Sequence, residues 1–305
     1  MIFVNDPLLV AAANAAYKGR RRFVDRTNAE LARFVKRATG SERKSNEKVA
    51  LVVGVGNPAD EILAQAKRLR SDLIVMGSHG LSGLQKAFFG STTEQVLRKS
   101  NVPVLAIPPS VRARNQTAVP TGITRVIAPI DLAGEWQSDA VRAAEIAGDF
   151  EAPLVLVHVL APVQTPPWLR PRRDTDNRRI EKATKALERV RTKLFADLRS
   201  MSTKVLLGEP AHEIARLTTH PGSLVVMSLR GTAGVWGMRR GSVAYHVLTH
   251  ALTPLLALPR RRIGGRFSVR ARRAVNEILT ARDRAEMAGI DALLSVGSGR
   301  KRGGS

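Results

Sequence analysis

The chain contains two copies of one sequence unit, and this repeat limits its possible folds more than any other feature. Residues 72–108 and 223–259 align without a gap at a constant offset of 151 positions. The alignment pairs Met76 with Met227, Gly80 with Gly231, Gly90 with Gly241, Ser91 with Ser242 and Pro103 with Pro254. Upstream, residues 56–62 align with residues 208–214. The chain therefore holds two related domains.

The repeat predicts the domain boundaries. Residues 1–110 form the first copy and residues 122–262 the second. Residues 111–121 are rich in Pro, Thr, Asn and Gln, which is typical of a linker. Residues 263–305 form a separate basic tail, in which residues 268–288 have the spacing of an amphipathic helix.

In the second copy, apolar runs alternate with helical segments. Strands are predicted at 126–131, 154–160, 204–207, 224–227 and 255–258, and helices at 138–149, 176–199, 211–217 and 242–250. Alternating strands and helices imply right-handed crossovers and a parallel sheet. The predicted fold class is α/β: two tandem, doubly wound, five-stranded parallel-sheet domains with flavodoxin-like layering.

The first copy starts late relative to the second. Residues 1–4 match residues 156–159, and nothing before them matches the strand at 126–131 or the helix after it. Loss of this strand would expose backbone groups of its neighbours. We expect either that the start codon is misassigned or that a partner completes the domain. An in-frame strand with Pro and Asp before Met1 would indicate the former.

Glycines after a strand of the first copy predict a phosphate-binding loop. Gly77 and Gly80 let the backbone approach a ligand closely, and Gly90 precedes Ser91 and Thr92 at the start of a helix. Free N–H groups at a helix N-terminus bind anions. The sequence from Ser91 to Glu94 also has the pattern of a capping box, which predicts a side-chain cap for this helix.

This glycine pattern, with Met76 and His79, resembles the adenine-nucleotide signature of the universal stress protein family, whose fold is adenine nucleotide alpha-hydrolase-like. The resemblance implies a strand-1 Asp on the ribose side, a strand-2 Val near the base and a glycine loop on the phosphates. It transfers to the following cofactor-binding candidates: Val4, Gly56, Met76, Gly77, His79, Gly80, Gly90, Ser91, Thr92, Pro129, Asp131, Val159, Gly208, Gly231, Gly241 and Ser242. For Asp131 a turn-capping role is the alternative, and for His79 a structural role in the loop.

The second copy departs from the signature. Ser228 replaces the counterpart of Gly77, Arg230 that of His79, and Val243 that of Thr92. Arg239 and Arg240 could add charged contacts to phosphate. The first copy thus has the better loop but no strand-1 Asp, and the second has the Asp but an altered loop.

The family resemblance implies a cytoplasmic, ATP-binding stress-response regulator with little or no hydrolysis and no catalytic residue of its own, with Mg²⁺ as a companion of ATP. Family members associate through the last strand of the domain. This predicts that residues 104–107 and 255–258 pair the two domains within one chain, and it leaves homodimers open.

The composition suggests an alternative function. The chain has 49 Lys and Arg against 26 Asp and Glu, a net charge of +23. Residues 1–48, 168–199 and 260–305 carry +6, +6 and +8 of it, so the excess lies outside the expected core. The alternative is a basic scaffold or nucleic-acid-binding protein whose nucleotide pockets are vestigial, with the tail as the contact to nucleic acid.

Other motifs are weaker. Residues 54–59 match G-x-G-x-x-A, a dinucleotide pattern, but the second copy keeps only Gly208, which favours a structural turn. His246 and His250 lack accompanying carboxylates, and His158 is expected to be a hydrogen-bonded core residue. The absence of Cys excludes disulfides. No run of about 20 apolar residues and no signal peptide are found, which leaves the cytoplasm as the expected location.

Overall fold

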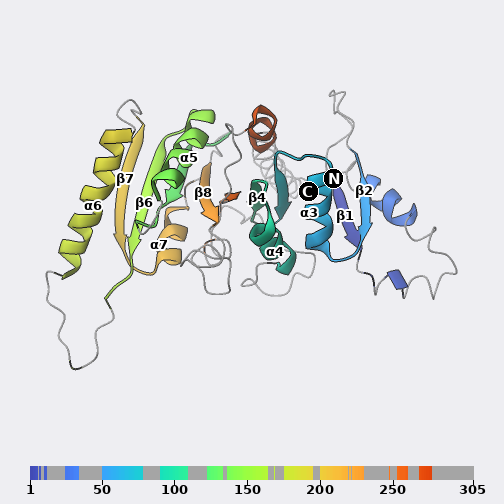
Figure 1. The fold of residues 1–305 in the computed structure, drawn as a ribbon, viewed down its shortest axis with the longest axis horizontal. Coiled ribbons are helices and arrows are strands. Elements are labelled where there is room, and N and C mark those ends of the chain that lie inside the picture. The colour runs from blue at the N-terminus through green and yellow to red at the C-terminus, as the bar shows by residue number, and fades with distance from the viewer. Residues whose placement is uncertain are drawn as a thin grey trace, which may run out of the picture. The chain divides into compact units, whose positions relative to one another are not determined.

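The computed structural model describes residues 1–5, 7, 10–11, 25–33, 50–77, 90–108, 122–132, 136–163, 168, 175–194, 200–218, 220, 222–229, 247, 253–259 and 268–276. The chain divides into two compact units, Met1–Ser71 and Asp72–Ser305. Figure 1 shows the helices and strands of both.

The second copy forms a five-stranded parallel sheet in the second unit. Its strands are β5 (Arg125–Pro129), β6 (Leu154–Leu160), β7 (Met201–Leu207), β8 (Ser223–Leu229) and β9 (Leu255–Pro259). Their order across the sheet is β7-β6-β5-β8-β9, all parallel, with the first strand β5 in the centre. The predicted α/β class and doubly wound parallel sheet are therefore confirmed for this copy.

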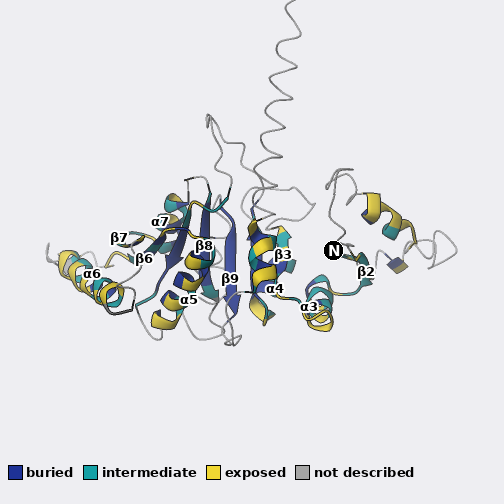
Figure 2. Cartoon of the chain, turned by 90° about the horizontal axis from the view of Figure 1, so that it is seen from above, coloured by how far each residue is buried: buried dark blue, intermediate teal, exposed yellow. Residues whose placement is uncertain are grey.

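Three helices connect these strands: α5 (Trp136–Asp149), α6 (Thr175–Leu194) and α7 (Pro210–Leu217). Small residues let α5 lie close to the sheet, because Ala140 and Ala143 are buried in one cluster with Leu224, Val226 and other strand residues. Figure 2 shows the central strands in the buried colour and the outer faces of the helices exposed. Burial of this apolar surface is the main force that holds helix and sheet together.

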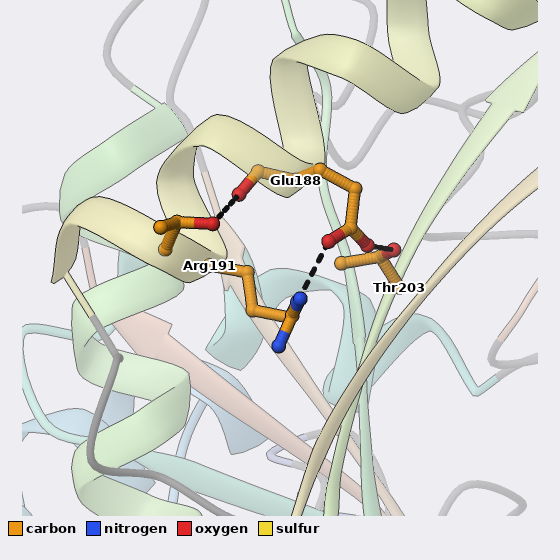
Figure 3. Close-up of polar contacts among 4 residues, drawn as sticks. Glu188, Arg191 and Thr203 are labelled. Atoms are coloured by element: carbon orange, nitrogen blue, oxygen red, sulfur yellow. Dashed lines mark hydrogen bonds and ion pairs between the residues drawn. The ribbon is translucent and has the colours of Figure 1, made fainter.

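Helix α6 is fastened to β7 by polar contacts (Figure 3). Glu188 Oε1 accepts a hydrogen bond of 2.5 Å from Thr203 Oγ1, and Oε2 accepts one of 2.7 Å from Arg191 Nε. These donors, the Thr203 hydroxyl first, lower the pKa of Glu188 because they stabilise the ionised carboxylate. Below this contact, Leu187 is fully buried in the core.

The last strands of the two copies join in one sheet. The first copy contributes β3 (Ile74–Gly77), α4 (Ser91–Lys99) and β4 (Val104–Ile107), and β4 pairs antiparallel with β9. Leu105 lies opposite Leu256, and both are fully buried. The full sheet has the order β3-β4-β9-β8-β5-β6-β7. The expected pairing of the two final strands is thus present within the chain.

The rest of the first copy forms the first unit. Strands β1 (Ile2–Asn5) and β2 (Val52–Val55) make a parallel two-stranded sheet, followed by α3 (Pro58–Arg68), and residues 25–33 are helical. Val4 lies opposite Gly54, as Val159 lies opposite Leu206 in the second copy. The repeat therefore extends to strand register.

The described strands of the first copy lie in two sheets, β1 with β2 and β3 with β4. In the second copy the first strand, β5, is central and pairs with β6 and β8 on either side. No described segment of the first copy corresponds to β5.

Part of the basic tail packs onto the second unit. Residues 269–276 are helical, and the Ser268 hydroxyl accepts a hydrogen bond from Ala271 N. Val275 is fully buried in the cluster that contains Leu105 and Leu256, and Arg272 Nη1 lies 3.6 Å from Asp149 Oδ1. The predicted helix is confirmed over these residues, and there it serves packing; residues 277–288 lie outside the described residues.

Candidate functional site

The N-terminus of α4 belongs to the loop that is predicted to bind phosphate in the first copy. Gly90 is the N-cap, in an extended conformation, and no side chain caps the helix. The capping box predicted for residues 91–94 is therefore wrong, because Ser91 and Thr92 already lie inside the helix. As a result, N–H groups of the first turn have no side-chain acceptor from the cap position. They keep the capacity to bind an anion.

A buried hydroxyl holds this helix end against the preceding strand. Thr93 Oγ1 donates a 3.0 Å hydrogen bond to the carbonyl of Gly77, and Thr93 is 4% exposed. The bond fixes the distance between the last residue of β3 and the first turn of α4. Sequence analysis named Ser91 and Thr92 but missed Thr93. The sequence signal for Thr93 is its position two residues after Ser91, which places it on the buried face of the helix.

In the second copy, the end of β5 brings Asp131 beside the neighbouring strand. Ile130 N donates to Val157 O at 2.7 Å, and His158 Nδ1 lies 2.8 Å from Ile130 O. A carbonyl only accepts, so Nδ1 carries the proton in this contact. His158 is half-buried and hydrogen-bonded, as expected. These bonds fix the backbone directly before Asp131, which is half-buried.

Pro129 and Val159 complete this strand-end group. Pro129 lies opposite Val157 in the β5–β6 register, so Val159 lies just beyond the end of β5. Ser228 and Leu229 end β8, which flanks β5 on its other side. The carboxyl ends of parallel strands at such a reversal of strand order are where open α/β sheets bind ligands.

The two strand-end groups point to opposite ends of one sheet. β3 and β4 run parallel, β4 runs antiparallel to β9, and β9, β8 and β5 run parallel. The carboxyl end of β3, with Met76 and Gly77, therefore faces the direction opposite to the end of β5. Ligands at the two places would not compete for the same space.

Val4 lies in the first unit, close to Gly56. Gly56 N donates to Asn5 O at 3.2 Å, and the counterpart Gly208 N donates to Leu160 O at 3.0 Å. Asn5 is 4% exposed, and its Nδ2 has no hydrogen-bond partner among the described residues. A cavity of about 260 Å³ is lined by Phe3, Asn5, Arg26, Thr27 and Glu30. Sequence analysis missed Asn5. The available signal was a polar residue at the end of an apolar strand.

Gly56 and Gly208 have a backbone role that accounts for their presence in both copies. Both have φ of 157°, and a Cβ on Gly208 would lie 2.8 Å from Glu213 Cγ. Each precedes a helix that starts with proline, as the structural interpretation of residues 54–59 predicts. Their contact to a cofactor stays a prediction.

Several predicted site residues lie outside the described residues. These are His79, Gly80, Gly231, Gly241 and Ser242, together with Arg230, Arg239, Arg240 and Val243. Of the predicted helix 242–250, only Val247 is described, as helical and fully buried.

The remaining described surface offers no competing centre of acid, base or metal chemistry. A hollow of about 580 Å³ along α6 is lined by Lys185, Glu188, Arg189 and Thr192, but the Glu188 carboxylate is already occupied by Thr203 and Arg191. Within the described residues, no three His, Asp or Glu side chains are placed to hold a metal ion. In the same part of the chain, no helix has the length and apolar character needed to cross a membrane.

Comparison with known proteins gives a family. The profile of the universal stress protein family matches residues 4–108 and 122–259. Universal stress protein MJ0577 of Methanocaldococcus jannaschii is 45% identical over 60 residues, which are 20% of this chain and 37% of that protein. The chain thus matches little more than a third of this curated relative.

One solved structure that matches most of the chain agrees with it in fold. A universal stress protein from Archaeoglobus fulgidus superposes with a TM-score of 0.50 at 19% identity, over 79% of this chain and 80% of that chain. Another from that organism, solved in complex with dAMP, is 19% identical over 44% of this chain and 96% of its own, with a TM-score of 0.33.

Proposed function

Because the chain belongs to the universal stress protein family, we propose that it is a stress-response regulator that binds ATP and turns it over slowly or not at all. A family relative solved with dAMP supports adenine nucleotides as the ligand class. The proposal assigns no catalytic residue, since no described cluster joins a nucleophile to a general base.

The observation that carries the proposal is the strand-end group of the second copy. Asp131 follows the central strand, and His158 fixes the backbone before it with a 2.8 Å contact to Ile130 O. A carboxylate at this place can accept hydrogen bonds from ribose hydroxyls. Val159, on the adjacent strand, offers an apolar contact to the base. We therefore assign the nucleoside to the second copy.

A separate anion site in the first copy is the second part of the proposal. It would not hold the phosphates of a nucleotide bound at Asp131, because the ends of β3 and β5 face opposite directions. The uncapped first turn of α4 and its bond to Gly77 support an anion-binding role in the first copy. Mg²⁺, if it accompanies ATP, would take its ligands mainly from phosphate oxygens and water, because the described residues provide no carboxylate cluster.

Titration of purified protein with a fluorescent ATP analogue tests the proposal. Asp131→Ala should weaken binding by about tenfold or more, the loss of one charged hydrogen-bonding group. Glu145→Ala, which removes an exposed carboxylate from α5, is the matched control and should bind normally. Gly90→Val reports on the first copy. If it abolishes binding and Asp131→Ala does not, the nucleoside assignment is wrong.

Two further readouts test binding and hydrolysis separately. Hydrogen exchange with and without ATP should show protection at residues 128–132 and 156–160. Release of ADP over hours should stay at the level of a blank. If millimolar ATP changes neither the melting temperature nor exchange, the chain is not an ATP-binding protein.

A further inference from the structure

Helix α6 holds more basic than acidic side chains, and its acids are already engaged. Each acid forms an ion pair with a base three or four residues further along the helix: Asp176 with Arg179 at 2.8 Å, Glu181 with Lys185 at 2.5 Å and Glu188 with Arg191 at 2.7 Å. Among the bases of α6 whose side chains are described, Arg178, Lys182 and Arg189 remain. None of these three has an acidic partner within the described residues.

The three remaining bases share one face of the helix with Lys185. At 3.6 residues per turn, Arg178, Lys182, Lys185 and Arg189 lie within about 60° of one another around the helix axis and span about 16 Å along it. Leu187 points to the opposite side and is fully buried. The four bases therefore face away from the sheet, and all four are exposed. Figure 2 shows the exposed colour along α6. We call these four residues the basic stripe.

A hollow lies beside the second half of the basic stripe. It has a volume of about 580 Å³ and is lined by Lys185, Glu188, Arg189 and Thr192. Glu188 is the acid among these lining residues, and its carboxylate already accepts the 2.7 Å hydrogen bond from Arg191 Nε (Figure 3). An anionic group in the hollow therefore meets two bases and one carboxylate whose charge is neutralised.

The acids of this chain are too few to neutralise the basic stripe together with its other bases. The chain has 49 Lys and Arg against 26 Asp and Glu. The sequence around α6 has the same imbalance, because residues 168–199 carry a net charge of +6. The counterpart of the stripe is therefore an anion from outside the chain, with several charges spaced along about 16 Å.

The surroundings of the basic stripe favour nucleic acid over a lipid or protein surface. A helix that lies on a membrane inserts its apolar face into the lipid, but the apolar face of α6, with Leu187, is buried in the core. Protein interfaces are built around apolar and aromatic side chains, and among residues 176–192 no large apolar side chain is exposed. The phosphates of nucleic acid bind to Lys and Arg without such an anchor.

We propose that the basic stripe of α6 binds the phosphate backbone of nucleic acid without reading its sequence. Arg178 and Arg189 can each donate two hydrogen bonds to one phosphate, and Lys182 acts as a point charge between them. Contacts to phosphate position a protein on nucleic acid and carry no base specificity. The inference does not rest on the proposed ATP site, because Asp131 follows β5 and α6 contributes nothing to that strand end.

Titration of a labelled DNA duplex of about 20 base pairs into the full-length protein, followed by fluorescence anisotropy, tests the proposal. The parent should bind with a Kd of about 10⁻⁶ to 10⁻⁴ M at physiological salt. The triple variant Arg178→Gln, Lys182→Gln and Arg189→Gln should bind at least about tenfold more weakly. The slope of log Kd against log salt should fall by about 3, because three phosphate contacts are lost.

A control variant with the same change in charge separates the stripe from the total charge of the protein. Lys67→Gln, Arg68→Gln and Arg98→Gln replace three exposed bases on α3 and α4. This variant should keep both the affinity and the salt slope of the parent. Both triple variants should melt like the parent and keep its response to ATP, since exposed side chains contribute little to stability.

A variant that strengthens binding complements these losses. Glu181→Gln removes the partner of Lys185 and leaves this base of the stripe without an acid. The affinity for the duplex should rise severalfold, and the salt slope should rise by about 1. A variant that merely loses structure does not gain affinity in this way.

Specific results would overturn the proposal. One is an equal loss of affinity in the control variant, because total charge is then the cause. Another is a salt slope that the stripe variant leaves unchanged. A third is the absence of saturable duplex binding by the parent at low salt. Vesicles of phosphatidylserine and phosphatidylcholine provide the last comparison: if the stripe variant loses binding to vesicles but keeps binding to DNA, the partner is a lipid surface and the proposal is wrong.

Discussion

β3 and β8 are the same strand of the repeat, and they have different surroundings. β8 lies inside the sheet between β5 and β9, while β3 ends the sheet. The two sequences, Leu73–Met76 and Leu224–Met227, are close to identical in character. Among the described residues, β8 has neighbouring strands on both sides and a covering helix, the outer edge of β3 has neither, and the burial differs accordingly. Burial here is thus a property of the neighbours, and local sequence similarity does not determine it.

An acidic substitution should give the largest difference in stability between a variant in β8 and the matching variant in β3. Val226→Asp places a carboxylate where only apolar groups surround it and should destabilise the protein by about 3–5 kcal/mol. Val75→Asp at the exposed counterpart should change stability by less than about 0.5 kcal/mol. Urea unfolding of both variants measures the difference. Equal costs would mean that the β3 edge is covered.

Truncating side chains where β4 pairs with β9 tests a contact to which both copies contribute. Leu256→Ala in β9 and Leu105→Ala in β4 should each cost about 2–5 kcal/mol, because each leaves a cavity at a fully buried site. The two costs should be similar and should not add in the double variant, since the residues are direct neighbours. Full additivity in urea unfolding would contradict the pairing of β4 with β9.

The turns before α3 and α7 extend the comparison to a place where the copies agree. Gly208→Ala and Gly56→Ala should each destabilise by about 1–3 kcal/mol, because an added Cβ meets Glu213 or Glu61 at an unfavourable φ. Gly148→Ala is the control: it has open space in α5 and should stabilise by up to about 1 kcal/mol. The melting temperatures of the three variants measure this order of stability. Neutral Gly56→Ala and Gly208→Ala variants would refute the turn geometry.

The contact between α6 and β7 should give the smallest effect. The pKa of Glu188 is lowered in the folded protein, so its contribution is present above the pKa of the unfolded chain and is lost as pH falls through the folded pKa. Because 41% of the Glu188 side chain is exposed to solvent, Glu188→Gln should cost less than about 1 kcal/mol at pH 7. The melting temperatures of the variant and the parent should converge as the pH is lowered through the folded pKa. A difference that does not shrink with falling pH would exclude the carboxylate as its cause.

The α/β class and the parallel sheet of the second copy follow from the repeat and the apolar runs, whereas the pairing of the final strands was implied by the family resemblance. The shared strand register is seen only in the structure, where Gly56 and Gly208 hold the same bond to the strand beside them. The cap of α4 was mispredicted because the series of Ser, Thr and Glu matches the capping-box pattern in the sequence alone. The sequence does not show that Ser91 is already the first residue of the helix and that Gly90 is its N-cap. Thr93 escaped notice because its partner, Gly77 O, is sixteen residues away.

The sequence predicted which residue types form the candidate site and at which strand ends they lie. It did not predict how their side chains are arranged. Asp131 and Val159 could be placed on adjacent strands from the order of elements alone. The contact from His158 to Ile130 O depends on the rotamer of a half-buried ring, which no periodicity encodes. Asn5 illustrates the same limit, since only the three-dimensional structure shows that its amide is buried.

The antiparallel join of β4 and β9 lies within a single polypeptide. Two separate chains that met through this contact would dissociate on dilution, and their melting temperature would depend on concentration. Here the tether keeps the halves at a high effective concentration at any dilution. The strand pairing that two separate chains would obtain by association is thus present in a single molecule at any dilution.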